Sequence, residues 1–228
     1  MKTDFRQNTL FGQKIISSIG FDEQEILRDI LYLHTDGKVI DCDPTFSVGN
    51  FYKKGIPAPV HKFDKTPTFP GVIGASSDNL PLDSNSINVI MFDPPFVIGG
   101  ENYQEAKNGS SIIAKRFTSF KNFEELKTMY SESLKEFSRV LRDQGIVIFK
   151  CQDVVVSQKN HFTHCWIMYE AIRNGFYPKD LFILLARARL TDGRVQQHAR
   201  KYHSYFWVLK KETCKVEYFA NTGQNLST

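Results

Sequence analysis

Residues 87–96, Ile-Asn-Val-Ile-Met-Phe-Asp-Pro-Pro-Phe, join a short apolar run directly to an acid and two prolines. The run 87–92 has the length and apolar character of a buried parallel strand. Pro94 and Pro95 fix two successive φ angles and remove two backbone donors, so the chain after the strand is stiff. The segment therefore predicts a strand with Asp93 and Phe96 on a rigid turn at its carboxyl end.

On either side of this segment, strand-length apolar runs alternate with helical patterns. Helices are predicted over residues 22–33, 123–141 and 162–173. In the first, Asp22 and Glu25 form a capping-box pattern, while Ile26, Ile30 and Leu33 share a face. The further strand candidates are residues 38–41, 60–63, 72–75, 145–150, 181–185 and 205–209. This alternation favours an α/β fold with a mostly parallel sheet and helices on both faces, in which ligands bind beyond the carboxyl ends of the strands.

Size and composition bound the possibilities. The 228 residues fit one α/β domain, and no apolar run approaches the roughly 20 residues that span a bilayer. The first residues lack the pattern of a secretory signal, so a cytoplasmic location is expected. The four cysteines are scattered, and no zinc-ligand spacing is present, so no metal site is predicted. We expect an N-terminal extension over residues 1–21, a catalytic domain over 22–211 and a C-terminal tail over 212–228.

The turn at Asp93 can grip a flat amino group. The exocyclic nitrogen of adenine or cytosine is a poor nucleophile because its lone pair is delocalised into the ring. If Asp93 and the carbonyl of Pro94 accept its two hydrogens, the nitrogen moves toward tetrahedral geometry and can attack a methyl donor. Phe96 would supply a ring on which an extruded base stacks, and this chemistry needs no metal. Taken alone, the tetrapeptide is equally compatible with a merely rigid turn.

The context of this turn resembles a known family. Residues 74–82 and a polar turn at 83–85 precede the strand that ends at Asp93. Over residues 39–211, this order resembles the Rossmann-like S-adenosyl-L-methionine (SAM)-dependent methyltransferases, specifically the amino-methylating DNA methyltransferases with an Asp-Pro-Pro-aromatic motif. The resemblance implies a class I methyltransferase fold with a seven-stranded sheet and SAM as cofactor. It makes Asp93, Pro94, Pro95 and Phe96 the catalytic residues.

The same resemblance implies a set of cofactor-binding residues. They are Asp43, Pro44, Thr45, Phe46 and Gly49 in a loop after the first strand, Asp64 for the ribose hydroxyls, and Ser77, Asp78 and Asn79 around the adenine ring. Ser47 stands where the family usually has a glycine. A helix-capping turn at 43–49 and ordinary turn residues at 77–79 are the alternatives. Pro57 and Pro59 predict that the usual helix between the first two strands is very short or absent.

Two further segments fit the family pattern. Residues 136–145 resemble its helix-to-strand passage, to which we assign an architectural role and no chemistry. The strand after it ends in a polar cluster that includes Lys150 and Gln152. Either side chain could contact the target base or strand, or satisfy backbone groups of a loop.

Positive charge is concentrated near the C-terminus. Residues 187–211 hold seven Lys and Arg residues and one acid, a balance of +6 that exceeds the +4 of the whole chain. Such a patch is typical of phosphate binding, although a solvated loop is the alternative. The loop 97–122 offers a second basic surface. The predicted nucleic-acid contacts are Lys115, Arg116, Arg194, Arg200, Lys201 and His203.

These features predict an enzyme that methylates a nucleobase amino group. DNA is the expected substrate, with adenine favoured over cytosine N4 by Asp before Pro-Pro. The alternatives are methylation of an RNA base, methylation of a protein amide, and a catalytically idle module that binds nucleic acid. The chain has no room for a large recognition domain, so target recognition would be minimal, loop-based or supplied by a partner subunit. No membrane partner is expected.

Overall fold

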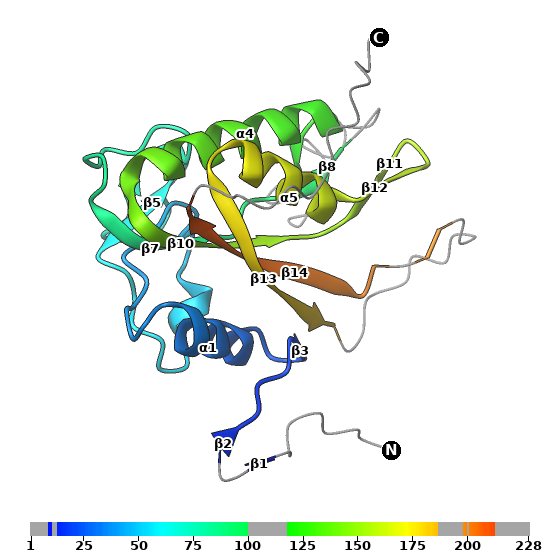
Figure 1. Cartoon of the computed structure of the whole chain (residues 1–228). Helices are drawn as coiled ribbons and strands as arrows, with labels where there is room; N and C mark the ends of the chain where they lie inside the picture. Colours follow the sequence, from blue (N-terminus) through cyan, green and yellow to red (C-terminus); the bar gives the residue numbers. More distant parts are fainter. Residues whose placement is uncertain (1–8, 11–12, 100–117, 187–197, 200, 213–228) are drawn as a thin grey trace, which may run out of the picture.

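The computed structural model describes residues 9–10, 13–99, 118–186, 198–199 and 201–212. Its centre is an eight-stranded sheet in the order β3-β13-β14-β10-β7-β4-β5-β6 (Figure 1). β14 runs antiparallel to both of its neighbours, and the other pairings in this sheet are parallel. The strands are β3 (Ile19–Gly20), β4 (Cys42–Asp43), β5 (His61–Asp64), β6 (Ile73–Gly74), β7 (Ile87–Phe92), β10 (Leu141–Cys151), β13 (Phe176–Leu185) and β14 (His203–Lys211).

This is the mostly parallel sheet of an α/β fold that the sequence predicts. The seven expected strands are present, and β3 adds an eighth at the edge by pairing with β13. Three small pairs lie outside this sheet: β1 (Thr9–Leu10) with β2 (Gln13–Lys14), β8 (Val97–Ile98) with β9 (Thr118–Phe120), and β11 (Val154–Val156) with β12 (Lys159–His161). The pairing of β8 with β9 places Thr118 opposite Val97, the residue that follows Phe96.

Helices cover both faces of the sheet, as predicted (Figure 1). α1 (Glu23–His34) packs on one face, while α4 (Phe123–Val140) and α5 (Thr163–Arg173) pack on the other. The pleat of β7 separates the two cores, because Val89 and Met91 join the α1 side whereas Ile90 and Phe92 join the α4 side.

Both long helices begin at a side-chain cap, and the one at Asp22 was predicted. Asp22 accepts hydrogen bonds from the backbone of Gln24 and Glu25 at the start of α1, and Asn122 accepts one from Glu125 at the start of α4.

The predicted apolar face of α1 is wrong at its last turn. Ile26 and Ile30 are buried, but Leu33 is 44% exposed. His34 makes the contact with the sheet there, through a 2.9 Å hydrogen bond to Asp180. The first strand of the core also begins later than the predicted 38–41, so Asp43 is its last residue.

The connection from β4 to β5 contains only the short 3-10 helix η1 (Asn50–Tyr52), which confirms the effect expected of the nearby prolines. At the start of β10, a Cβ on Gly145 would lie 2.8 Å from the carbonyl oxygen of Arg142, so only glycine fits. This agrees with an architectural role for residues 136–145. No helix in the described part of the chain is long and apolar enough to cross a membrane.

Candidate active site

Four neighbouring strands end on the same side of the sheet, which we call the carboxyl edge because their carboxyl ends lie there. β6, β5, β4 and β7 lie side by side and parallel, so the residues that follow them meet at their carboxyl ends. The predicted cofactor loop follows β4, Asp64 closes β5, the predicted adenine-binding turn follows β6, and Asp93 follows β7. Ligands of such sheets bind at this edge. The fold thus gathers segments separated by up to about fifty residues of sequence.

Asp43 anchors the loop after β4. Its side chain is buried and accepts hydrogen bonds from the backbone N–H of Thr45 (2.8 Å), the Thr45 hydroxyl (3.1 Å) and the Tyr52 hydroxyl (2.7 Å). Burial raises the pKa of Asp43 to about 7, although these donors oppose the shift. Both carboxylate oxygens are therefore engaged in shaping the loop.

Thr45 links this loop to the Asp-Pro-Pro-Phe turn. Its hydroxyl donates to Asp43 and accepts a 2.9 Å hydrogen bond from the backbone N–H of Asp93. One side chain thereby fixes the carboxyl ends of β4 and β7 relative to each other.

The rest of the loop is a tight turn around an aromatic ring. Phe46 is buried and stacks on Tyr52 with ring centroids 5.4 Å apart. Ser47 and Gly49 have φ values of 50° and 68°, in the left-handed region. Ser47 adopts the geometry that the glycine it replaces would adopt freely, so the loop turns despite the substitution.

Asp64 lies directly against the loop. Its Oδ2 accepts from the backbone N–H of Ser47 at 3.2 Å, and its Oδ1 accepts from Thr66 at 2.8 Å. The side chain is only partly buried, and each carboxylate oxygen has a second lone pair. Asp64 can therefore still accept bonds from a diol.

The turn after β6 divides its side chains between the core and solvent. Ser77 is buried, and its hydroxyl lies 2.8 Å from that of Ser133 on α4. Asp78 and Asn79 are exposed. Asp78 and Asn79 are consequently available to a ligand, whereas the Ser77 hydroxyl packs toward the helix.

The Asp-Pro-Pro-Phe turn is braced from the α4 side. The buried Tyr130 donates a 3.1 Å hydrogen bond from its hydroxyl to the carbonyl of Pro95. Phe96 is partly buried against the same core, while the Asp93 side chain remains 27% exposed. Asp93 is thus held on a rigid backbone with one part of its carboxylate accessible.

Lys150, near the end of β10, gives Asp93 a buried cationic partner. Its ammonium lies 3.3 Å from Asp93 Oδ2 and 2.7 Å from Glu23 Oε2, and its side chain is 13% exposed. Burial raises the pKa of Asp93, and Lys150 opposes the rise. Burial would lower the pKa of Lys150, but Asp93 and Glu23 outweigh it and hold that pKa above its usual value. The sequence analysis predicted neither the pairing of Lys150 with Asp93 nor its pairing with Glu23.

Gln152 binds backbone groups of a loop, which is one of the two alternatives expected from the sequence. Its amide donates to the backbone carbonyls of His203 (2.7 Å) and Lys201 (3.4 Å), where the chain enters β14. Lys201 and His203 thus lie at the same edge of the sheet as the end of β10. Lys115, Arg116, Arg194 and Arg200 fall outside the described residues.

A polar network adjoins this entry. The buried Asp153 binds His164 Nδ1 at 2.7 Å and the Tyr205 hydroxyl at 3.3 Å, and Tyr205 in turn contacts His203. Burial acts to raise the pKa of Asp153, but the hydrogen bonds from His164 outweigh it and hold that pKa below its usual range. The network fixes the position of His203.

Not all of the basic stretch reaches this edge. Lys210 and Lys211 stand at the other end of β14, where Lys211 binds the carbonyl of Leu141 at 2.7 Å. Nine residues of strand span about 25 Å, so both lysines lie at the opposite edge from His203. The sequence prediction of one continuous patch over residues 187–211 is wrong for these two lysines, because β14 crosses the whole sheet.

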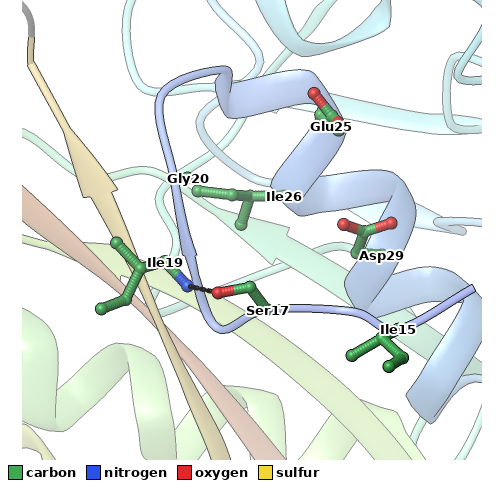
Figure 2. A pocket seen from close by; sticks show the side chains of 7 residues that line it. All are labelled: Ile15, Ser17, Ile19, Gly20, Glu25, Ile26 and Asp29. Carbon is green, nitrogen blue, oxygen red and sulfur yellow. Dashed lines mark hydrogen bonds between the residues drawn. The ribbon is translucent and has the colours of Figure 1, made fainter. Parts of the chain in front are cut away.

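A cavity of about 160 Å³ lies elsewhere, between residues 15–20 and α1. Figure 2 shows Glu25 and Asp29 projecting from α1 beside it, with Ile15, Ser17 and Ile19 on the segment that leads into the helix. It is smaller than the roughly 300–1,000 Å³ typical of ligand pockets, and no predicted site residue lines it. Within the described ranges, no three His, Cys, Asp or Glu side chains gather so as to hold a metal ion.

No protein-family model and no curated protein matches the chain. Three solved structures illustrate what it is similar to. A Thermus thermophilus protein in complex with SAM is 14% identical over 67% of this chain and 54% of its own, with a TM-score of 0.43. The PvuII DNA methyltransferase, specific for cytosine N4, is 15% identical over 62% of this chain and 49% of its own, with a TM-score of 0.42.

A SAM-dependent methyltransferase from Archaeoglobus fulgidus is 12% identical over 83% of this chain and 95% of its own, with a TM-score of 0.46. The chain spans about half the length of the Thermus protein. Likenesses of this degree say nothing of activity, so the chemistry has to come from the residues of this chain.

Proposed function

We propose that this chain is a SAM-dependent methyltransferase that methylates an exocyclic amino group of a nucleobase, most readily adenine in DNA. The observation that carries the proposal is the partly exposed carboxylate of Asp93, which lies on a rigid turn tied by Thr45 to the loop after β4. The catalytic unit would comprise residues 22–211, between an N-terminal extension over 1–21 and a tail over 212–228.

In this function, Asp93 accepts a hydrogen bond from one N–H of the amino group, and the carbonyl of Pro94 accepts a hydrogen bond from the other. The nitrogen then presents its lone pair instead of sharing it with the ring. Pro95 contributes stiffness, since its carbonyl is already bound by Tyr130. Phe96 offers a ring face to an extruded base, a contact worth roughly 1–3 kcal/mol. The cofactor, when bound, would supply an electrophilic methyl group and leave as a neutral thioether, and the methylated nitrogen would lose one proton to solvent.

The donor and acceptor groups at the sheet edge fit this cofactor. Asp64 has lone pairs left for two ribose hydroxyls, and Asp78 and Asn79 are exposed beyond the next strand. The loop 43–49, with Pro44, Thr45 and Gly49, turns tightly next to Asp93 and would face the methionine part. Phe46 and Asp43 support the loop from beneath.

Nucleic acid would be held by basic residues near this edge. Lys201 and His203 stand where β14 begins, and Arg194 and Arg200 precede them closely in sequence. Lys115 and Arg116 belong to a different segment, which precedes β9 in the chain. Recognition of the target sequence would depend on loops or on a partner subunit. A structured RNA with an accessible base amino group is the alternative substrate.

Calorimetry with SAM, followed by methyl-transfer assays on DNA, RNA and a glutamine-containing peptide, tests the proposal. We expect saturable SAM binding and transfer to DNA. Transfer to RNA alone would make the enzyme an RNA methyltransferase, and transfer to the peptide alone would refute the nucleobase target. SAM binding absent at millimolar concentration would favour the idle nucleic-acid-binding module.

A further inference from the structure

The ammonium of Lys150 bridges two carboxylates that come from distant parts of the chain. Glu23 is the first residue of α1, and Asp93 follows β7. Lys150 lies 2.7 Å from the first and 3.3 Å from the second. Its charge is also placed over the rings of Phe51 and Phe206, at 5.1 and 5.7 Å from their centroids. These contacts fix the ammonium from several sides.

The pleat of the sheet explains why the three groups meet. Ile146 and Ile148 on β10 join the core on the α1 face, so Lys150, two residues on, points to that face. Val89 and Met91 on β7 do the same, and Asp93 continues their alternation. Lys150 and Asp93 therefore converge beneath the start of α1, where Glu23 completes the arrangement.

Placing a mostly buried lysine here costs folding free energy, which suggests that the residue has a functional role. The free-energy cost of removing an ammonium from water is offset only when its N–H donors are well paired. An apolar residue, like the phenylalanines around it, would satisfy packing alone. Of the two residues at the strand ends, Asp93 keeps more access to solvent, with 27% exposure against 13% for Lys150. The carboxylate, and not the ammonium, is therefore the group placed to meet a substrate.

We propose that Lys150 is a positioning residue for methyl transfer. Its ammonium, held by Glu23, keeps the Asp93 carboxylate ionised and oriented to accept a hydrogen bond from the target amino group. This inference rests on the proposed function. It assigns Lys150 no contact with the nucleic acid. Glu23 offsets part of the positive charge of Lys150. In this arrangement Lys150 stays bound without engaging the Asp93 carboxylate completely, so part of the carboxylate remains available to the substrate.

Among the described residues, five titratable groups interact with the Asp93 carboxylate. They are Lys150 on β10, Glu23 on α1, Asp43 on β4, Tyr52 on η1 and Tyr130 on α4. Lys150 alone among them favours ionised Asp93, and Glu23 opposes it. Removing each of these two charges should therefore shift the titration of Asp93 in opposite directions.

The test is the pH dependence of kcat/KM for methyl transfer by the full chain, which reports groups of the free enzyme. We expect Lys150→Met to move the acid limb upward by about 1–3 pH units. We expect Glu23→Gln to move it downward and Lys150→Arg to leave it near the wild-type position. The same substrate serves every variant, so titration of the base cancels. A merely structural lysine would lower kcat/KM without moving the limb.

NMR titration of ¹³C-labelled aspartate carboxyls gives a second readout that needs no turnover, with the Asp93 signal assigned by its loss in Asp93→Asn. If wild-type enzyme transfers no methyl group, the proposed function fails, and the NMR shifts still decide the role of Lys150. If Lys150→Met does not fold, the downward shift in Glu23→Gln decides it. Unchanged titration of Asp93 in the folded variants would overturn the inference.

Discussion

The hydroxyl of Thr45 accepts a 2.9 Å hydrogen bond from the backbone N–H of Asp93. Through this bond, a residue predicted for the cofactor loop sets the backbone of the residue predicted for the target base. The two halves of the proposed reaction are thus coupled by one side chain.

Thr45→Val keeps the shape of the side chain but removes this acceptor. We expect a loss of about 1–3 kcal/mol in the free energy of unfolding, because the N–H of Asp93 is left without its partner, and a fall in kcat. Urea unfolding and methyl-transfer rates measure the two effects. Thr45→Ser, which retains the hydroxyl, is the control. Equal behaviour of the valine and serine variants would contradict the coupling.

Asp43 should make stability depend on pH. Burial raises its pKa in the folded protein to about 7, above an unfolded value of about 4, so the folded state binds the proton more tightly. This contribution to stability is fully present below pH 4 and is lost as the pH rises toward 7. Urea unfolding between pH 4 and 8 should show Asp43→Asn gaining stability relative to wild type with rising pH.

The partner of Asp43 offers a check on that cause. Tyr52→Phe removes a hydrogen-bond donor to the carboxylate, so the pKa of Asp43 should rise further. The pH range over which this contribution to stability is lost should then extend to higher pH. A stability difference between wild type and Asp43→Asn that stays constant with pH would refute this role of Asp43.

Gly49→Ala tests how closely the cofactor loop packs. The new Cβ would lie 2.7 Å from Cζ of the buried Phe46, in addition to the strain of φ 68°. Gly37→Ala is a matched control, since Gly37 has φ 78° but open space around its Cβ position. We expect about 1 kcal/mol of destabilisation from strain in the control, with a greater loss and weaker SAM binding for Gly49→Ala. Thermal unfolding measures the stability loss, and calorimetry measures SAM binding. Equal stability losses in the two variants would show that the Phe46 ring moves aside at no cost.

The basic stretch should act at one edge of the sheet only. Replacing Arg200 and Lys201 with alanine should lower the slope of log Kd against log salt for DNA by about 2, because two phosphate contacts are lost. Replacing Lys210 and Lys211 removes the same charge at the opposite edge and should leave the slope unchanged. Fluorescence anisotropy at several salt concentrations compares the pairs, and an equal effect of both would mean that only net charge matters.

Apolar runs of strand length and helical periodicity in the sequence predicted an α/β fold with a mostly parallel sheet, because these patterns act locally. The pairing of Lys150 with Asp93 and Glu23 was not predicted, since it depends on which face of the sheet each residue occupies. The alternation of β10 carried that information: Lys150 continues the buried face of Ile146 and Ile148. Leu33 was misjudged for a related reason, because helical periodicity does not show which residue of the last turn of α1 meets the sheet.

Contacts and distances between residues far apart in the chain were the hardest to predict from sequence. The hydrogen bond from Tyr130 to Pro95 joins residues far apart in the chain, and nothing in an apolar stripe distinguishes Tyr130 from its neighbours. Similarly, a charge run cannot reveal that a strand carries Lys211 across the sheet, away from His203.

The most direct test of the account is the single-turnover rate of methyl transfer to DNA by Asp93→Ala at saturating SAM. We predict a loss of at least about 100-fold in rate with SAM affinity unchanged, because Asp93 is assigned to the amino group and not to the cofactor. A rate close to that of the wild-type enzyme would contradict the central claim that this carboxylate grips the nucleophile.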